Sequence, residues 1–341
     1  MKVCIAGPSE RRETMQLQEA AAKKISSAGY EVVNYEKSGS GHRLRYGSLE
    51  DVAESDVLVA RIGTYDDAMW AAIGVARAAN IPIVPLWNEA WPLTKCYGFT
   101  KDIKDRNMQL VRPKGDKRSW PSTKKNGDAD IAGVVKDLKY LEQNLPEKNK
   151  RPEPSEANFE LPPYIVGDSR NWDNQDAYYK IEDWFLREGI HVISPPRSLD
   201  GYHPDRFPEK IEMPPDFDGV EECVLNAGPR SSMTIGRVHM RNLMGSRFEE
   251  GVAWWNMHPG LHLDGYVFPG RESPYKKYEE GKNPGMHLKS IFDQNLNVWG
   301  ITNSVGRLPS ELAPIIKRLR EAQRIRKAQE KSKKKPERRA G

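Results

Sequence analysis

The feature that most limits the fold of this sequence is the alternation of short apolar runs with segments of helical periodicity. Between residues 2 and 86 the pattern predicts strands over 2–6, 31–34, 56–62 and 81–86, and helices over 10–27, 49–53 and 67–79. Strands that alternate with helices form βαβ units, which build a mainly parallel sheet. The sequence therefore predicts an α/β fold here, with a ligand expected beyond the carboxyl ends of the strands.

The same order of patterns returns after a linker. Residues 146–163, PEKNKRPEPSEANFELPP, are rich in proline and charge and are predicted to connect two domains. Beyond them the sequence predicts strands over 164–167, 190–195, 223–227 and 261–268, and helices over 174–188 and 245–256. A repeat of domain size favours a tandem duplication of one α/β domain over a solenoid. We therefore predict domains over 1–145 and 164–320.

The charge of the chain is unevenly distributed. The net charge is +5, but Lys317–Gly341 holds twelve Lys or Arg and three Glu. The body is therefore mildly acidic, and residues 321–341 are predicted to be a basic tail. An amphipathic helix is expected to begin near Leu308 and to pack on the body as far as about Leu319. The tail is either a solvated extension or a weak, salt-sensitive contact for nucleic acid.

Several classes of protein are disfavoured by composition. The three cysteines, Cys4, Cys96 and Cys223, form no C-x-x-C pair, so no zinc knuckle or disulfide framework is predicted and a cytoplasmic location is expected. No apolar run is long enough for a membrane span, and the run at residues 3–6 is too short for a signal peptide. No metal or cofactor motif is recognised, so neither group is expected.

Two expected helix starts carry the residues that are most informative about function. Gly245–Ala253 reads GSRFEEGVA, and Ala68–Ala76 in the first half reads AMWAAIGVA. With the IAGP that ends the first strand, the G-T-x-[WF]-E-x-G-x-A pattern resembles the nucleoside 2-deoxyribosyltransferase family, which includes nucleotide N-glycosidases. The resemblance covers the chain only in short islands. It implies flavodoxin-like, doubly wound domains that cleave or transfer at the N-glycosidic bond of a nucleoside or nucleoside 5′-monophosphate.

The resemblance places Glu249 at the position of the family's nucleophile, with Gly251 following as in the motif. A carboxylate there attacks the anomeric carbon or stabilises its oxocarbenium charge. The alternative is that Glu249 and Glu250 are ordinary acids near a helix N-terminus, favoured by the helix dipole. Ala72 takes the corresponding position in the first half, so that half is expected to be a scaffold without a nucleophile.

The resemblance also implies residues that bind the substrate. Asp66 has the spacing of a base-contacting acid, with helix capping as the alternative. Asn107 and Asn283 follow the two helices at similar distances, and in the family such an Asn completes the sugar site of the neighbouring subunit. The two halves are therefore expected to pack as a pseudo-dimer in which Asn107 completes the Glu249 pocket. If they do not, a second chain must supply that group, and the protein is a homo-oligomer.

The second half departs from the family pattern around its expected site. Its first strand leads into Gly167-Asp168-Ser169-Arg170 instead of AGP, and Asn242 replaces the base-contacting acid. An amide can both donate to and accept from a base edge. Arg170, Arg241 and Arg247 are suited to a 5′-phosphate, although surface positions are the alternative. Two other functions stay open: a nucleotide-sensing module without catalysis, and a nucleic-acid-associated accessory protein.

Overall fold

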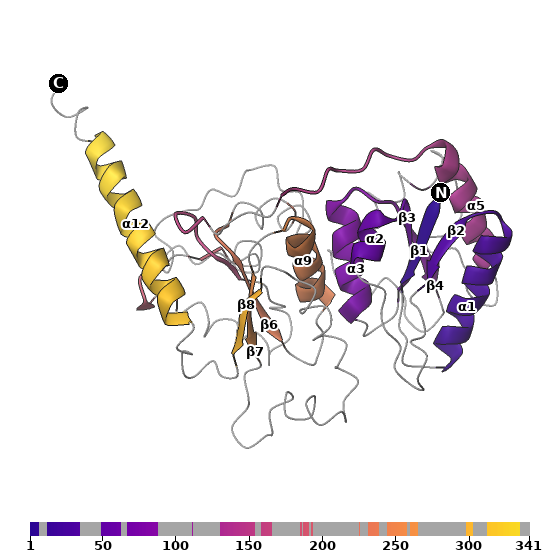
Figure 1. Cartoon of the computed structure of the whole chain (residues 1–341), viewed down its shortest axis with the longest axis horizontal. Helices are drawn as coiled ribbons and strands as arrows, with labels where there is room; N and C mark the ends of the chain where they lie inside the picture. The colour runs from indigo at the N-terminus through magenta and orange to yellow at the C-terminus, as the bar shows by residue number, and fades with distance from the viewer. Residues whose placement is uncertain are drawn as a thin grey trace, which may run out of the picture.

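The part of the chain that the structure describes forms two four-stranded parallel sheets, with helices between and outside them (Figure 1). The computed structural model describes residues 1–6, 12–34, 49–62, 67–87, 111, 130–153, 158–165, 185, 187–190, 192–193, 225, 231–238, 244–257, 260–264, 298–302 and 312–334. The strand orders are β2-β1-β3-β4 in the first sheet and β5-β6-β7-β8 in the second. The predicted α/β class and parallel sheet are confirmed, and the first order is compatible with a flavodoxin-like fold.

The first sheet is covered on both faces, which explains why its strands are apolar throughout. One face packs on α1 and α5, and the other on α2 and α3. The four strands and the first three helices closely match the predicted ones. The strands are β1 (Lys2–Ala6), β2 (Glu31–Asn34), β3 (Val57–Ile62) and β4 (Ile83–Trp87), and the helices are α1 (Arg12–Ser27), α2 (Leu49–Glu54), α3 (Asp67–Ala78) and α5 (Ile131–Gln143).

One row of residues across this sheet faces α3. Cys4 pairs with Leu58, and Leu58 pairs with Ile83, so all three side chains lie on the same face. All three are buried in one apolar cluster with Ala72 of α3. Burial disfavours the thiolate and raises the pKa of the Cys4 thiol from its ordinary 9.0 to about 12.

Cys4 gives a pH-dependent prediction. The folded protein keeps the thiol proton up to a pH of about 12, whereas the unfolded chain loses it near 9.0. The stability that this difference provides is complete below pH 9 and is lost as the pH rises. We expect the free energy of unfolding to fall by about 1.4 kcal/mol per pH unit above 9 through this group. Urea unfolding at pH 8 and pH 10 should show a smaller fall in Cys4→Ala than in wild type; equal falls would contradict the assignment.

The second sheet consists of β5 (Tyr164–Ile165), β6 (Thr234–Val238), β7 (Gly260–Asp264) and β8 (Val298–Thr302). Ile193 forms a parallel bridge with Tyr164, on the strand predicted over 190–195. The predicted strand over 223–227 is wrong, because Leu225 is helical and the strand beside β5 is β6. A short apolar run such as Val224-Leu225 does not distinguish a strand from a helix by periodicity. β8 was not predicted.

Helices α3 and α9 (Met244–Trp255) lie against each other between the two sheets (Figure 1). Their closest approach is reciprocal. A Cβ at Gly74 would overlap the carbonyl oxygen of Phe248, and a Cβ at Gly251 would overlap the carbonyl oxygen of Ala71. Glycine is thus required at both positions because helix backbones meet there. The apolar cluster that contains α3 continues into Phe248, Val252, Trp254 and Trp255 of α9.

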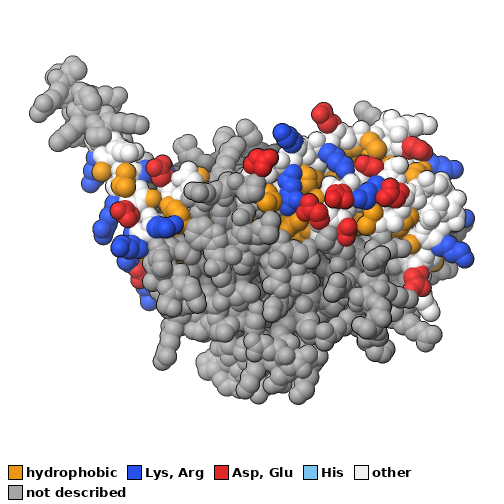
Figure 2. Space-filling model, in the orientation of Figure 1, with side chains coloured by type: hydrophobic (Ala, Val, Ile, Leu, Met, Phe, Trp, Pro, Cys, Tyr) orange, Lys and Arg blue, Asp and Glu red, His pale blue; other side chains and the backbone are white. Residues whose placement is uncertain are grey.

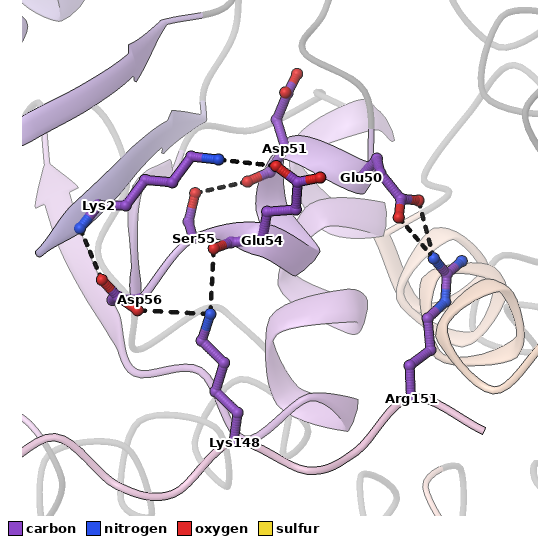
Figure 3. A network of polar contacts seen from close by, with 8 residues as sticks. All are labelled: Lys2, Glu50, Asp51, Glu54, Ser55, Asp56, Lys148 and Arg151. Carbon is purple, nitrogen blue, oxygen red and sulfur yellow. Dashed lines mark hydrogen bonds and ion pairs between the residues drawn. The ribbon is translucent and has the colours of Figure 1, made fainter.

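The first part of the predicted linker is anchored to the protein. Asn149 donates its backbone and side-chain amides to the carbonyl oxygens of Ala79 and Ala78, at 3.0 and 2.8 Å. The side chain of Arg151 donates to both carboxylate oxygens of Glu50 at 2.9 Å, as Figure 3 shows. Its guanidinium also lies 4.0 Å from the ring centroid of Trp254. Arg151 therefore joins α2 to α9 through an ion pair and a cation–π contact.

The last element that the structure describes is α12 (Leu312–Lys334), a helix at the edge of the molecule (Figure 1). Ile316 and Leu319 are buried, as predicted for the start of this helix. None of the helices in the described ranges combines the length and apolar character that a membrane crossing requires.

Candidate functional site

Glu249 lies in the second turn of α9, and only 6% of its surface is exposed. The resemblance led us to expect it in the first turn of the helix, but α9 begins at Met244 and has no acid in its first turn. The helix dipole acts mainly within the first turn, so it does not explain an acid at this position. A carboxylate in a nearly dry environment carries a desolvation cost, which requires polar partners.

Tyr164 supplies one such partner. Its hydroxyl donates to the Oε1 atom of Glu249 at 3.2 Å, and its side chain is 1% exposed. Tyr164 is the first residue of β5, so the bond connects the second sheet to α9 across 85 positions of sequence. A hydrogen bond to a carboxylate fixes the direction of its oxygens and favours its charged form.

Thr234 and Ser232 add two hydroxyls close to Tyr164 in the fold. Tyr164 pairs with Thr234 in parallel register, so both side chains lie on the face of the sheet that α9 covers. The side chains of Thr234 and Ser232 are 4% and 0% exposed, respectively. Among the described residues neither hydroxyl has a hydrogen-bond partner. Buried hydroxyls of this kind normally have a partner, so they are suited to a bound polar group.

The corresponding places in the first half are apolar. The row Cys4–Leu58–Ile83 crosses the first sheet as Tyr164–Thr234–Gly260 crosses the second. Ala72 and Glu249 occupy the same position in their helices, because each is the sixth residue, counted from Asp67 in α3 and from Met244 in α9. The first half thus has four apolar residues at these places. The second half has a glycine and three polar side chains, those of Tyr164, Thr234 and Glu249. Polar groups are costly to bury, so this difference between the two rows makes Glu249 and its polar neighbours the candidate site.

The side chains of the other predicted site residues lie outside the described part of the structure, so their roles stay predictions. Arg247 lies on α9 two positions before Glu249, and its side chain is outside what the structure describes. The other six also lie outside the described residues: Asp66, Asn107, Asp168, Arg170, Asn242 and Asn283. The loops at the carboxyl ends of β5 and β6, where the substrate is expected, belong to the same undescribed parts.

Sequence reasoning missed Tyr164 and Thr234. Tyrosine and threonine are common in strands, so neither residue gave a signal by itself. Only a comparison of the two halves strand by strand could have indicated them, because the first half has the apolar Cys4 and Leu58 at the matching places.

In the described ranges, no three His, Cys, Asp or Glu side chains come together as metal ligands would. No family model, curated protein or solved structure matches the chain.

Removal of the Tyr164 hydroxyl tests whether it supports Glu249. Tyr164→Phe leaves a buried carboxylate short of a donor, and we expect a loss of about 1–3 kcal/mol in unfolding free energy, measured in urea. Tyr30→Phe is the matched control, since Tyr30 donates to Glu142 at 3.3 Å at a partly buried site in the first half. We expect the control to lose less than about 1 kcal/mol. Equal losses of unfolding free energy in Tyr164→Phe and Tyr30→Phe would mean that Tyr164 does not specifically support the buried Glu249.

Proposed function

We propose that the protein cleaves or transfers at the N-glycosidic bond of a nucleoside or nucleoside 5′-monophosphate, with Glu249 as the carboxylate that acts at the anomeric carbon. The observation that carries the proposal is the buried hydrogen bond between Tyr164 and Glu249. Among the side chains that the structure describes, it lies where Tyr164 and Thr234 of the second sheet stand in place of the apolar Cys4 and Leu58 of the first. A structural core position does not need this exchange, as Ala72 in the first half illustrates.

The chemistry assigned to Glu249 follows from its surroundings. As the base leaves, positive charge develops at the anomeric carbon, and a carboxylate in a poorly solvated site interacts with it strongly. In the covalent form, a Glu249 oxygen bonds to that carbon while the carbon–nitrogen bond breaks, and the departing base takes a proton from solvent. Water or a second base then attacks the anomeric carbon, the bond from this carbon to Glu249 breaks and the carboxylate is regenerated, which gives hydrolysis or transfer. The hydrogen bond from Tyr164 to Oε1 fixes the orientation of the carboxylate, and therefore the direction from which it approaches the anomeric carbon.

Several features support the further proposal that the halves are copies of one domain packed as a pseudo-dimer. The offset that relates the starts of α3 and α9 also relates Ile83 and Gly260, the starts of β4 and β7. Both helices are 12 residues long and are followed by a non-glycine residue with positive φ, Asn80 at 58° and Met257 at 50°. The same offset relates Gly74 to Gly251 and Ala71 to Phe248. The contact of Gly74 with Phe248 is therefore the counterpart of the contact of Gly251 with Ala71, as a two-fold axis requires.

The test is incubation with a panel of nucleosides, 2′-deoxynucleosides and their 5′-monophosphates, followed by chromatography for released base. A second free base is added in a parallel series, because transfer consumes it and hydrolysis does not. Release of base from at least one substrate supports the proposal. Calorimetry on the same panel separates the alternatives: binding without release would favour a nucleotide-sensing module, and the absence of both would overturn the glycosidic assignment.

A further inference from the structure

The outer part of α12 is a basic surface that the glycosidic proposal does not use. The start of the helix is fixed to the body, where Arg320 forms an ion pair with Glu188 and donates from Nε to its carbonyl oxygen at 2.7 Å. The guanidinium of Arg318 lies 5.7 Å from the ring centroid of Phe159. Beyond Arg320 the helix leaves the body, and its far end extends away from the other elements (Figure 1).

The basic residues of this outer part are arranged along one face. Arg324, Lys327 and Lys331 follow Arg320 at the spacings of four, seven and eleven that keep residues on one side of a helix. All three are exposed, and Figure 2 shows Lys and Arg side chains gathered along the described part of the helix. The whole helix has nine Lys or Arg and two Glu. Like charges four residues apart destabilise a helix, and two acidic residues offset only part of the repulsion among nine basic ones.

The dimensions of this stripe fit a nucleic-acid backbone. Arg324 to Lys331 spans roughly 10 Å at 1.5 Å per residue, which equals about three phosphates along one strand of a duplex. A membrane surface fits less well, because an interfacial helix needs a broad apolar face. Ile325, at 49% exposure, is the only large hydrophobic side chain that is exposed in the described part of α12.

We infer that α12 is a nucleic-acid contact surface, in which Arg324, Lys327 and Lys331 bind phosphates of the backbone without reading base sequence. The surface is separate from Glu249. It lies on a helix that is anchored at one end. Beyond Arg320, every side chain that the structure describes is exposed except that of Ala322, which is half-buried. Contacts of this kind neutralise phosphates and release counterions, so the affinity falls steeply with salt.

The test is fluorescence polarisation with the full chain and a labelled 20-base-pair DNA duplex, from 50 to 300 mM NaCl. We expect log K against log salt to have a slope of about −3, as for three neutralised phosphates. The triple variant R324Q/K327Q/K331Q should bind at least tenfold more weakly at 50 mM NaCl. The control K23Q/K24Q/K139Q removes the same charge from exposed positions on α1 and α5 and should bind like wild type.

Two results would overturn the inference: equal weakening by both triple variants, or no duplex binding at 50 mM NaCl. Binding to vesicles of phosphatidylserine and phosphatidylcholine without binding to the duplex would replace the nucleic-acid partner by an acidic membrane surface. Circular dichroism of the triple variant shows whether α12 is still formed. Base release from mononucleotides should be unchanged in this variant, so failure here and failure of the glycosidic proposal are distinguishable.

Discussion

Glu249→Gln is expected to reduce the release of base at least about a thousandfold, which corresponds to about 4 kcal/mol of transition-state stabilisation. The amide keeps the size of the side chain and can still accept a hydrogen bond from Tyr164, which bonds to Oε1 at 3.2 Å. It cannot act as an anionic nucleophile or balance an oxocarbenium charge. The measurement is the initial rate of base release by chromatography, on the substrate that wild type cleaves best.

The matched control for this variant is Asp137→Asn. Asp137 lies on α5 of the first half and is 1% exposed, so this change also replaces a buried carboxylate by an amide. We expect Asp137→Asn to change unfolding free energy and to leave the rate per folded molecule close to that of wild type. If Glu249→Gln kept more than a tenth of the wild-type rate, or if both variants lost activity equally, Glu249 would not be the catalytic carboxylate.

The first half could be predicted closely because local signals agree with its tertiary environment. Its strands are buried on both faces, which gives continuous apolar runs such as Val57–Ala60. Its first helix is followed by Gly29, whose φ of +94° favours glycine. The second half was predicted less well. A helical Leu225 was assigned to a strand, and β8 was missed because VWGIT is a short run without a clear alternation.

The candidate site shows a similar division. Glu249 could be found from its motif, because a carboxylate followed by a glycine within one helix is a local pattern. Tyr164 could not, because its bond to Glu249 depends on how α9 lies over β5. The contact of Arg151 with Trp254 likewise depends on packing between the halves. A charged residue in a Pro-rich segment is typical of a solvated linker, so a contact of Arg151 with both α2 and α9 could not be predicted.

Gly74→Ala is expected to lower the free energy of unfolding by about 3 kcal/mol, although Gly to Ala inside a helix normally raises it by about 1 kcal/mol. The reason is the backbone of α9. The added Cβ would overlap the carbonyl oxygen of Phe248 and lie 2.9 Å from its carbonyl carbon and 3.1 Å from the amide nitrogen of Val252. Backbone atoms cannot rotate away as a side chain can, so α3 and α9 must separate and open the shared apolar cluster.

Gly251→Ala should have a similar effect, because its Cβ would overlap the carbonyl oxygen of Ala71 and lie 2.9 Å from its carbonyl carbon. Once one substitution has separated the helices, the second meets less resistance. The double variant should therefore lose less than the sum of the two, by about 1–2 kcal/mol in a double-mutant cycle measured by urea unfolding. Gly29→Ala is the contrast: no atom lies within 4 Å of its Cβ, and only the left-handed backbone is strained, at about 1–2 kcal/mol. Additive losses below 1 kcal/mol at Gly74 and Gly251 would mean that the two helices do not meet, and the pseudo-dimer would have to be abandoned.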